Sequence, residues 1–177
     1  MHSLAVVAAA LVLAGCTFNT MTPRTVIGPP PTPARTLVIG TLNEDEPQWQ
    51  SRRTQYVRDI TEWVRRNGGF AEVVDGAAGP APEGSVILVT RITNYDKGNA
   101  VLRVLVGMGA GQAEIRGEVE IRDRAGAVLL SFESKESYLG GSGIGGAGFL
   151  DMDDLMRRFA ESAAEATVKW SRGQSIK

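Results

Sequence analysis

The sequence predicts an α/β (α+β) domain in which two amphipathic helices pack on a mixed or antiparallel sheet of about five to six strands. Two segments, 47–67 and 151–170, show the 3.6-residue periodicity of helices, and several short apolar runs between them have the length of strands. The clearest strand is 113–122, where apolar and charged residues alternate. Because an amphipathic helix buries its apolar stripe against another element, this order favours two helices on one sheet.

The amino-terminal segment is predicted to be an export signal. An uncharged apolar run, 4–12, ends in Leu13-Ala14-Gly15-Cys16, and a short apolar run followed by small residues is typical of a signal peptide. The form Leu-Ala-Gly-Cys is the lipobox of bacterial lipoproteins. There the chain is cut between Gly15 and Cys16, the cysteine thiol receives diacylglycerol, and the new amino terminus is acylated, for example with palmitate. We therefore predict a lipoprotein signal peptide over 1–15 and a membrane anchor at Cys16, since the run is too short for a spanning helix of about 20 residues.

Residues 16–35 are interpreted as a lipidated tether. The segment 17–34 has few apolar residues and five prolines: Pro23, Pro29, Pro30, Pro31 and Pro33. Such a composition favours a semi-rigid extended linker that would hold the domain clear of the membrane. A single α/β domain over 36–172 is then expected.

The first half of this domain is predicted to contain three strands and one helix. Leu37-Val38-Ile39 is expected to be a buried strand, and a helix is expected to begin at Pro47 and to end at Gly68-Gly69. Strands follow at 70–74 and 86–89, and the second should be central because it is apolar on both faces. The apolar face of the helix comprises Trp49, Tyr56, Val57, Ile60, Trp63 and Val64.

The second half is predicted to contain the remaining strands and the second helix. A polar turn at 94–99 precedes an apolar strand at 101–106, which Arg103 interrupts. The alternating strand 113–122 turns at 123–126 and returns through Val128, Leu130 and Phe132. The helix over 151–170 has an apolar face made of Leu155, Phe159, Ala163, Ala166 and Trp170.

Composition excludes several classes of site. The 19 basic and 20 acidic residues give a net charge of −1, and no basic cluster stands out, so no nucleic-acid partner is expected. The single cysteine is the predicted lipid site, and the single histidine, His2, lies in the predicted signal. A mature chain without histidine or free thiol cannot build a Ser-His-Asp triad, a Cys-His dyad or a His/Cys zinc site. We therefore expect no cofactor, no metal and no enzymatic activity.

Two glycine-rich segments are candidate structural or interaction sites. Gly107, Gly109 and Gly111 precede a strand and not a helix, so they favour a bend where backbones approach closely over a dinucleotide loop. The segment 140–148, with six glycines that include Gly141 and Gly145, precedes the second helix. It is interpreted as a flexible loop before a helix whose first turn is acidic, or as a loop that contacts a partner.

The sequence resembles a known bacterial lipoprotein family, the one that carries the domain of unknown function numbered 4410. The resemblance lies in 97–103, which leads through Val106 into Gly107-Met108-Gly109-Ala110-Gly111, then in 119–123 with Gly126, and in the late glycine-rich loop. It extends over about 37–170, with Met108 standing where a bulkier apolar residue is usual. The resemblance implies an envelope lipoprotein with an α/β domain, and it supplies no activity and no catalytic residues.

Together these observations lead us to expect a non-enzymatic cell-envelope lipoprotein that serves as a protein-interaction or assembly module. Its partner would be another envelope protein or a second copy of itself. Thr17 follows the predicted lipidated cysteine, and the absence of aspartate there favours the periplasmic face of the outer membrane. Two alternatives stay open: a module that binds a small glycan or lipid, and a hydrolase built on two carboxylates, for instance from 44–46 and 151–154.

Overall fold

The computed structural model describes residues 16–29, 34–43, 49–99, 111–139 and 152–176. They form one six-stranded sheet with two helices, α1 (Gln50–Asn67) and α3 (Met152–Ser171), and a short 3₁₀ turn, η2 (Gly76–Ala78). The strands are β1 (Cys16–Val26), β2 (Thr36–Leu42), β3 (Glu72–Asp75), β4 (Ser85–Asp96), β5 (Ala113–Arg122) and β6 (Val128–Leu139). The predicted α+β class, with two helices and a mixed sheet, is confirmed.

The sheet combines a parallel and an antiparallel half. Its order is β1-β6-β5-β4-β2-β3, so β1 and β3 are the two edge strands. β2 runs parallel to both β3 and β4, because α1 returns the chain between β2 and β3. The β4-β5, β5-β6 and β6-β1 pairs are antiparallel, and the turn at 123–126 joins β5 directly to β6.

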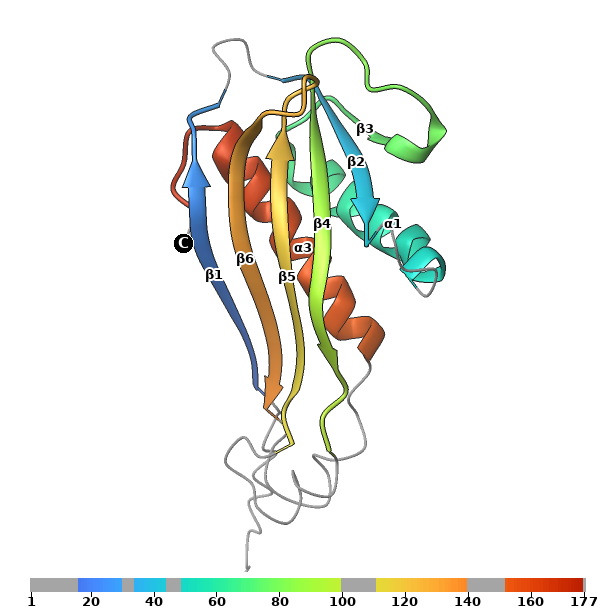
Figure 1. Cartoon of the computed structure of the whole chain (residues 1–177), viewed down its shortest axis with the longest axis vertical. Helices are drawn as coiled ribbons and strands as arrows, with labels where there is room; N and C mark the ends of the chain where they lie inside the picture. The colour runs from blue at the N-terminus through green and yellow to red at the C-terminus, as the bar shows by residue number, and fades with distance from the viewer. Residues whose placement is uncertain (1–15, 30–33, 44–48, 100–110, 140–151, 177) are drawn as a thin grey trace, which may run out of the picture.

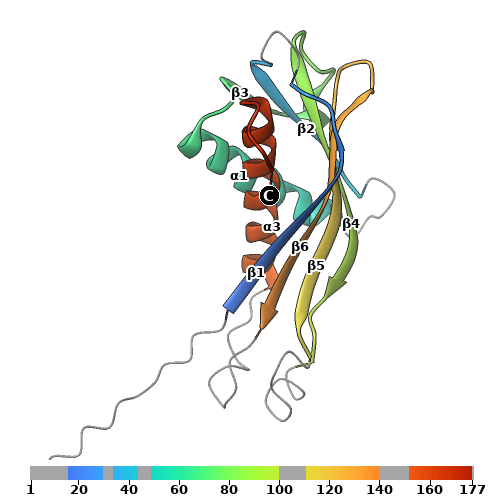
Figure 2. The ribbon, with the colours of Figure 1, turned by 90° about the vertical axis from the view of Figure 1, so that its left-hand side faces the viewer.

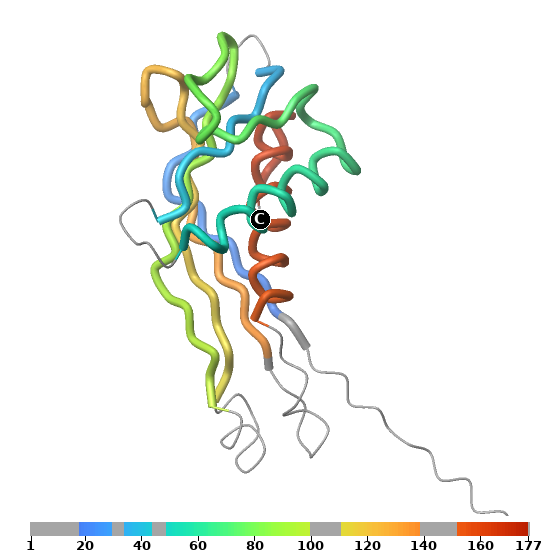
Figure 3. Tube along the Cα trace, turned by 90° about the vertical axis from the view of Figure 1, so that its right-hand side faces the viewer, coloured from blue at the N-terminus to red at the C-terminus, as the bar shows by residue number. Residues whose placement is uncertain are grey.

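Both helices cover the same face of the sheet, and the other face is left open (Figures 1 and 2). The helices pack on each other as well as on the strands. Figure 3 shows α3 running along the length of the antiparallel strands while α1 lies beside it on the β2 side. This two-layer arrangement gives the domain a single core between the helices and the sheet.

The alternation predicted for 113–122 sets the composition of the two faces of β5. Ala113, Ile115, Val119 and Ile121 are fully buried against the helices, and the charged residues between them are only partly buried. The predicted apolar faces of the helices also lie in the core. Trp49, Tyr56, Ile60 and Val64 of the first helical segment are buried, and Val57 and Trp63 are partly buried; Leu155, Phe159, Ala163, Ala166 and Trp170 of α3 are all buried.

The structure corrects the expectation that residues 16–35 form a tether outside the domain. Cys16–Val26 pair with β6 along its whole length, from Cys16 opposite Leu139 to Val26 opposite Leu130. Pro23 is compatible with this pairing because it lies on an edge strand where the register shifts, and the missing N–H costs little there. The other four prolines follow the strand. The threonines at 17, 20, 22 and 25 have the high β-propensity that the proline count obscured.

Smaller differences concern the ends of elements. β4 continues through Asp96, so the turn expected at 94–99 is wrong for its first three residues. α1 begins at Gln50 and β3 at Glu72, a few residues after the expected positions. The strand expected at 101–106, with Arg103, lies outside the described residues. β1 brings the strand count to six.

Candidate functional site

Cys16 is the first residue of β1 and lies at one end of the sheet. Its backbone is opposite Leu139, the last residue of β6, and the neighbouring ends of β5 and β4 follow at the same level through the pairs Ala113–Tyr138 and Asp96–Glu114. The predicted lipid site therefore coincides with the beginning of the folded domain. No segment of tether separates the two.

Of the predicted glycine sites, Gly111 alone belongs to the described part of the chain. It has a left-handed backbone with φ of 69°, and its carbonyl accepts a hydrogen bond of 3.1 Å from the Asn99 N–H. This bond closes the described end of the β4–β5 pair, in line with a structural role for Gly111. Gly15, Gly107, Gly109, Gly141 and Gly145 lie outside the described residues.

The open face of the sheet has a network of ion pairs. Arg24 of β1 reaches past its neighbour strand and pairs with Glu133 of β6 at 2.9 Å and with Glu118 of β5 at 2.6 Å. Further pairs on this face are Arg116–Glu114 at 3.0 Å, Lys135–Glu114 at 2.6 Å and Arg122–Glu120 at 2.6 Å. The carboxylates and cations thus satisfy one another, and the hollow among them, of about 190 Å³, is smaller than typical small-molecule sites of about 300 Å³ or more.

A buried polar cluster connects the edge strand to the helix layer. Glu136 of β6 is 3% exposed, and its carboxylate accepts hydrogen bonds from Asn19 Nδ2 of β1 and, at 2.6 Å, from Ser162 Oγ of α3. Asn19 Nδ2 also donates to Ser162 Oγ at 2.7 Å. Burial raises the pKa of Glu136, although the two hydrogen bonds act in the opposite direction. This three-residue cluster fixes β1 against both β6 and α3.

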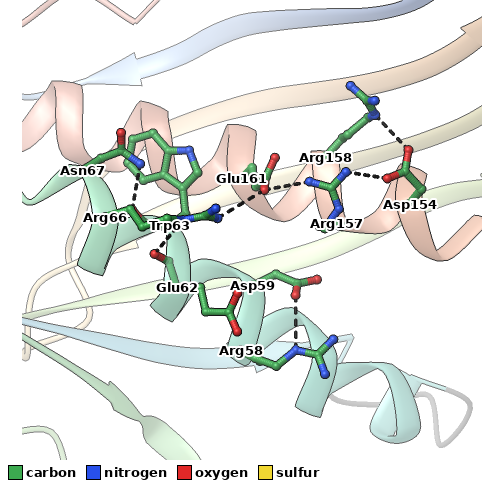
Figure 4. Close-up of polar contacts among 10 residues, drawn as sticks. All are labelled: Arg58, Asp59, Glu62, Trp63, Arg66, Asn67, Asp154, Arg157, Arg158 and Glu161. Atoms are coloured by element: carbon green, nitrogen blue, oxygen red, sulfur yellow. Dashed lines mark hydrogen bonds and ion pairs between the residues drawn. The ribbon is translucent and has the colours of Figure 1, made fainter.

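A second set of charges lies between α1 and α3 (Figure 4). Arg157 of α3 bridges Asp154 at 2.5 Å and Glu161 at 2.8 Å, and Glu161 also faces Arg66 of α1 at 3.7 Å. Although burial works in the opposite direction, hydrogen bonds from Arg157 and Arg158 lower the pKa of Asp154. Of these two acids, Glu161 joins the helices through Arg66, whereas Asp154 pairs within α3.

Asp59 of α1 is the least satisfied charge in this layer. It is 5% exposed, and among the described residues its Oδ2 has no hydrogen-bond partner, while its Oδ1 has a long contact of 3.5 Å from Arg58 Nε. Burial is the main cause that raises the pKa of Asp59. An isolated carboxylate in this place lowers stability, since the charge is desolvated without adequate compensation.

A pocket of about 350 Å³ lies at the carboxyl end of β2, beside the beginning of α1. Its lining contains four neutral hydrogen-bonding side chains, Thr41, Asn43, Gln50 and Thr54, together with Arg53. The Asn43 amide is already bonded to the backbone of Ile92. Arg53 is already paired, because its two terminal nitrogens donate to both carboxylate oxygens of Asp75 and to the carbonyls of Ile39 and Gly40. The bond from Arg53 lowers the pKa of Asp75. The pocket therefore offers hydroxyl and amide groups to a neutral ligand and no spare cation to an anion.

The two carboxylate clusters proposed for a hydrolase are not brought together within the described residues. Residues 44–46 and Asp151 lie outside them. Asp153 pairs with Arg52 at 2.8 Å, which connects the beginnings of α3 and α1, and Asp154 pairs with its own helix. Among the described side chains, no three His, Cys, Asp or Glu residues are grouped closely enough to hold a metal ion. Within the same residues, no helix has the length and apolar character needed to cross a membrane.

Sequence reasoning missed three of these features: the Asn19–Glu136–Ser162 cluster, buried Asp59 and the Arg53–Asp75 pair. Asn19 lies in a segment whose proline content predicts a tether, so its role in a folded strand is not evident from the sequence. The signal that could have revealed it is the alternation in 18–22, where Asn19 and Met21 occupy one face of an otherwise threonine-rich strand. Asp59 could not be found, because its position next to the apolar face of α1 is common for exposed acids.

Comparisons with known proteins give a family and a likeness of fold. The family described as "Domain of unknown function (DUF4410)" matches residues 44–142, which are 99 of the 177 residues. No curated protein matches the chain. Two solved structures with distant structural similarity are forms of the PelC dodecamer from Paraburkholderia phytofirmans, both 12% identical in sequence. A variant of PelC has a TM-score of 0.48, with 84% of this chain and 94% of that chain covered, and the second structure has a TM-score of 0.47, with 84% and 96% covered. Because the family model matches more than half of the chain, this chain belongs to the DUF4410 family.

Proposed function

We propose that this chain is a lipid-anchored protein of the bacterial cell envelope, and that its domain acts by binding a partner. One observation carries the proposal: Cys16 is both the cysteine of the Leu-Ala-Gly-Cys sequence and the first residue of β1. Cleavage before Cys16 would release a chain whose first residue is also the first residue of the folded sheet.

We propose further that the anchor lies in the outer membrane and the domain in the periplasm. Thr17 stands where an aspartate would favour retention in the inner membrane. The expected partner is another envelope protein or a second copy of the chain. The two edge strands, β1 and β3, each have one side unpaired in the described sheet, so both are available to add a strand from a partner.

Binding is favoured over catalysis by the residues available to the mature chain. After Cys16 there is no histidine, and the proposed lipid would occupy the only thiol. The acids whose pKa is lowered, Asp75, Glu114 and Asp154, are held by neighbouring cations or amides. Carboxylates engaged in this way are poorly placed to exchange protons with a substrate.

The proposal is tested by following lipid and partner together in the native cells. Full-length protein should incorporate labelled palmitate and cofractionate with membranes, and the Cys16→Ala variant should do neither. Crosslinking in intact cells followed by mass spectrometry should then yield a discrete partner that depends on Cys16. A wild-type protein that carries no lipid would contradict the anchor, and a lipidated protein without any crosslinked partner would contradict the binding role.

The pocket at the carboxyl end of β2 supports a second candidate function, binding of a small neutral glycan. Its volume of about 350 Å³ falls within the range of small-molecule sites, and Thr41, Gln50 and Thr54 are among the residues that line it. The neutral disaccharide N,N′-diacetylchitobiose should raise the melting temperature of the wild-type protein and should leave that of Thr54→Trp unchanged. Equal responses from the two proteins would remove this candidate.

A further inference from the structure

Four strands have one end at the same end of the domain as Cys16. Antiparallel pairing brings the first residue of β1, the last residue of β6, the first residue of β5 and the last residue of β4 to the same end of the sheet. Figure 2 shows that α3 begins at this end too. A lipid on Cys16 would therefore bring this whole end of the domain close to the bilayer, because no tether intervenes.

Phe18 is an exposed aromatic side chain at this end. It is 50% exposed, which makes it one of three large apolar residues with high exposure in the described part of the chain. Only one residue separates it from Cys16, so its Cα lies about 7 Å along the strand from the proposed lipid. Leaving half of a phenylalanine in water is unfavourable, at roughly 25 cal/mol for each Å² of apolar surface.

The direction of the Phe18 side chain follows from its neighbours. Asn19 contacts Ser162 of α3, so it points toward the helices. Because successive side chains of a strand point to opposite faces, Phe18 points away from the helix layer. On the neighbouring strand β6, Ser137 lies opposite Phe18. The next residue of β1 on the same face is Thr20, so the residues directly beside Phe18 are uncharged. The nearest ion pair on this face is Lys135–Glu114. Lys135 is one residue pair farther from the end, and Glu114 lies at the level of Phe18 but beyond Ser137, two strands away.

The other two exposed apolar residues belong to the opposite end. Val26 is 61% exposed and Ile27 53% exposed. Val26 is eight residues after Phe18 in the same strand, a distance of about 27 Å. The two ends of β1 are thus similar in apolar exposure and differ in their distance from Cys16. The register shift after Pro23 also places Val26 opposite the core residue Leu130, so Val26 is a control for distance from the lipid and not for the face of the sheet.

We infer that Phe18 rests in the interfacial region of the bilayer, and that it holds the Cys16 end of the sheet directly against the lipid. The inference rests on the proposed lipidation of Cys16. Aromatic and other large apolar side chains are favoured at the boundary between headgroups and acyl chains. The acyl chains would supply the affinity for the membrane. Phe18 would limit the tilt of the domain, because it lies about 7 Å from Cys16 along β1. The Asn19–Glu136–Ser162 cluster holds this part of β1 in place.

The test uses single thiols, because the chain has no cysteine other than Cys16. Phe18→Cys, Thr20→Cys and Val26→Cys are produced as full-length lipidated proteins, labelled with a nitroxide and reconstituted into vesicles of phosphatidylethanolamine and phosphatidylglycerol. Collision with oxygen reports lipid around the nitroxide, and collision with a water-soluble nickel complex reports water. We expect the ratio of oxygen to nickel accessibility to be several-fold higher at position 18 than at position 26, with position 20 between them.

Each other outcome overturns the inference in a distinguishable way. Equal ratios at positions 18 and 26 would show that the domain stands clear of the bilayer although it is anchored. Protection of position 18 from both reagents would show that a protein covers it. A wild-type protein that incorporates no palmitate and reacts with the nitroxide at Cys16 would overturn the proposed function together with the inference. If Phe18→Cys does not fold, as judged by its urea midpoint, the comparison of positions 20 and 26 decides.

Discussion

Gly117 illustrates how a single residue sets the distance between α3 and the sheet. It lies in the middle of β5 on the helix-facing side, between the buried residues Ile115 and Val119. A Cβ atom at this position would lie 2.8 Å from Cζ of Phe159 and 3.0 Å from the carbonyl oxygen of Arg91. Phe159 is fully buried, so its ring has no room to move aside. The absence of a side chain at 117 is thus required for α3 to approach the sheet.

Gly117→Ala should therefore destabilise the domain by about 1–3 kcal/mol, the usual cost of overpacking a core. The free energy of unfolding is measured by urea denaturation of the soluble domain. Gly28→Ala is the matched control, because a Cβ there has no atom within 4 Å, and we expect a change within about 0.5 kcal/mol. Equal stabilities of the Gly117→Ala variant and the wild type would show that α3 can shift to accept a methyl group.

Asp59 is the residue at which the domain loses stability to a buried charge. Its neighbours are Arg58 and Glu62 on the same helix and Arg157 on α3, and none of them donates a hydrogen bond to Oδ2. The pKa of Asp59 is higher in the folded state than in the unfolded chain. The unfavourable contribution is thus absent below the ordinary pKa of about 3.8, grows as the pH rises through the folded-state pKa, and is complete above it.

Asp59→Asn should raise the free energy of unfolding at pH 7, because the amide carries no charge to desolvate. The gain should shrink as the pH falls through the folded-state pKa and should vanish below about 3.8. Urea midpoints at a series of pH values provide the measurement, with Glu83→Gln, an exposed acid that does not act on Asp59, as the control. A variant that is less stable than the wild type at pH 7 would mean that the charge of Asp59 contributes favourably.

At the level of elements, β5 and the helices could be predicted from the sequence and β1 could not. The bounds 113–122 and the buried faces of the helices follow from strict periodicities of two and of 3.6 residues, and these periodicities reflect burial on one face. β1 has one face against α3, but Asn19 and Met21 are its main contacts there, so it lacks an apolar period. What fixes β1 is pairing with β6 and a hydrogen-bonded cluster, and neither leaves a hydropathy pattern.

Asn19→Ala should weaken the attachment of β1. The substitution removes one of the two donors to the buried carboxylate of Glu136, which should cost about 1–3 kcal/mol. Hydrogen exchange of the amides in β1 and at its border with β6 should accelerate, while exchange in β5 and α3 should change little. Thr20→Val is the control, since it keeps the β-branched shape on the opposite face and touches no member of the cluster. Unchanged exchange in β1 would show that the backbone ladder alone holds the strand.

At the scale of the whole molecule, the class of the domain could be predicted but the arrangement of its strands could not. No pattern in the sequence indicates that β1 pairs with β6. β2 follows β1 directly in the chain, yet the two strands are separated by three others in the sheet. The β1–β6 pairing is non-local, and many orders of six strands would bury the same apolar residues. The pocket beside α1 depends on the same arrangement, because its lining comes from the end of β2, the beginning of α1 and η2.

A truncation tests whether residues 16–26 belong to the domain. A soluble chain that begins at Thr17 should be more stable by several kilocalories per mole than one that begins at Ile27, because the shorter chain lacks the β1–β6 ladder and exposes the edge of β6. Urea denaturation of both chains, each without Cys16, provides the comparison, and the slope of the transition should also change with the surface buried. A true tether would leave the two midpoints equal.

The position of Cys16 at the beginning of β1 also determines how the domain would respond to mechanical load. A partner that pulls the domain away from the membrane would apply tension along the axis of β1, parallel to its ladder with β6. Hydrogen bonds of an antiparallel pair are perpendicular to the strands, so this load shears all the bonds together and does not open them one by one. Pulling from the other end of the strand, at Val26 and perpendicular to the sheet, would unzip the same bonds in sequence. Attachment at Cys16 would therefore also determine the direction in which the domain best resists a pulling force.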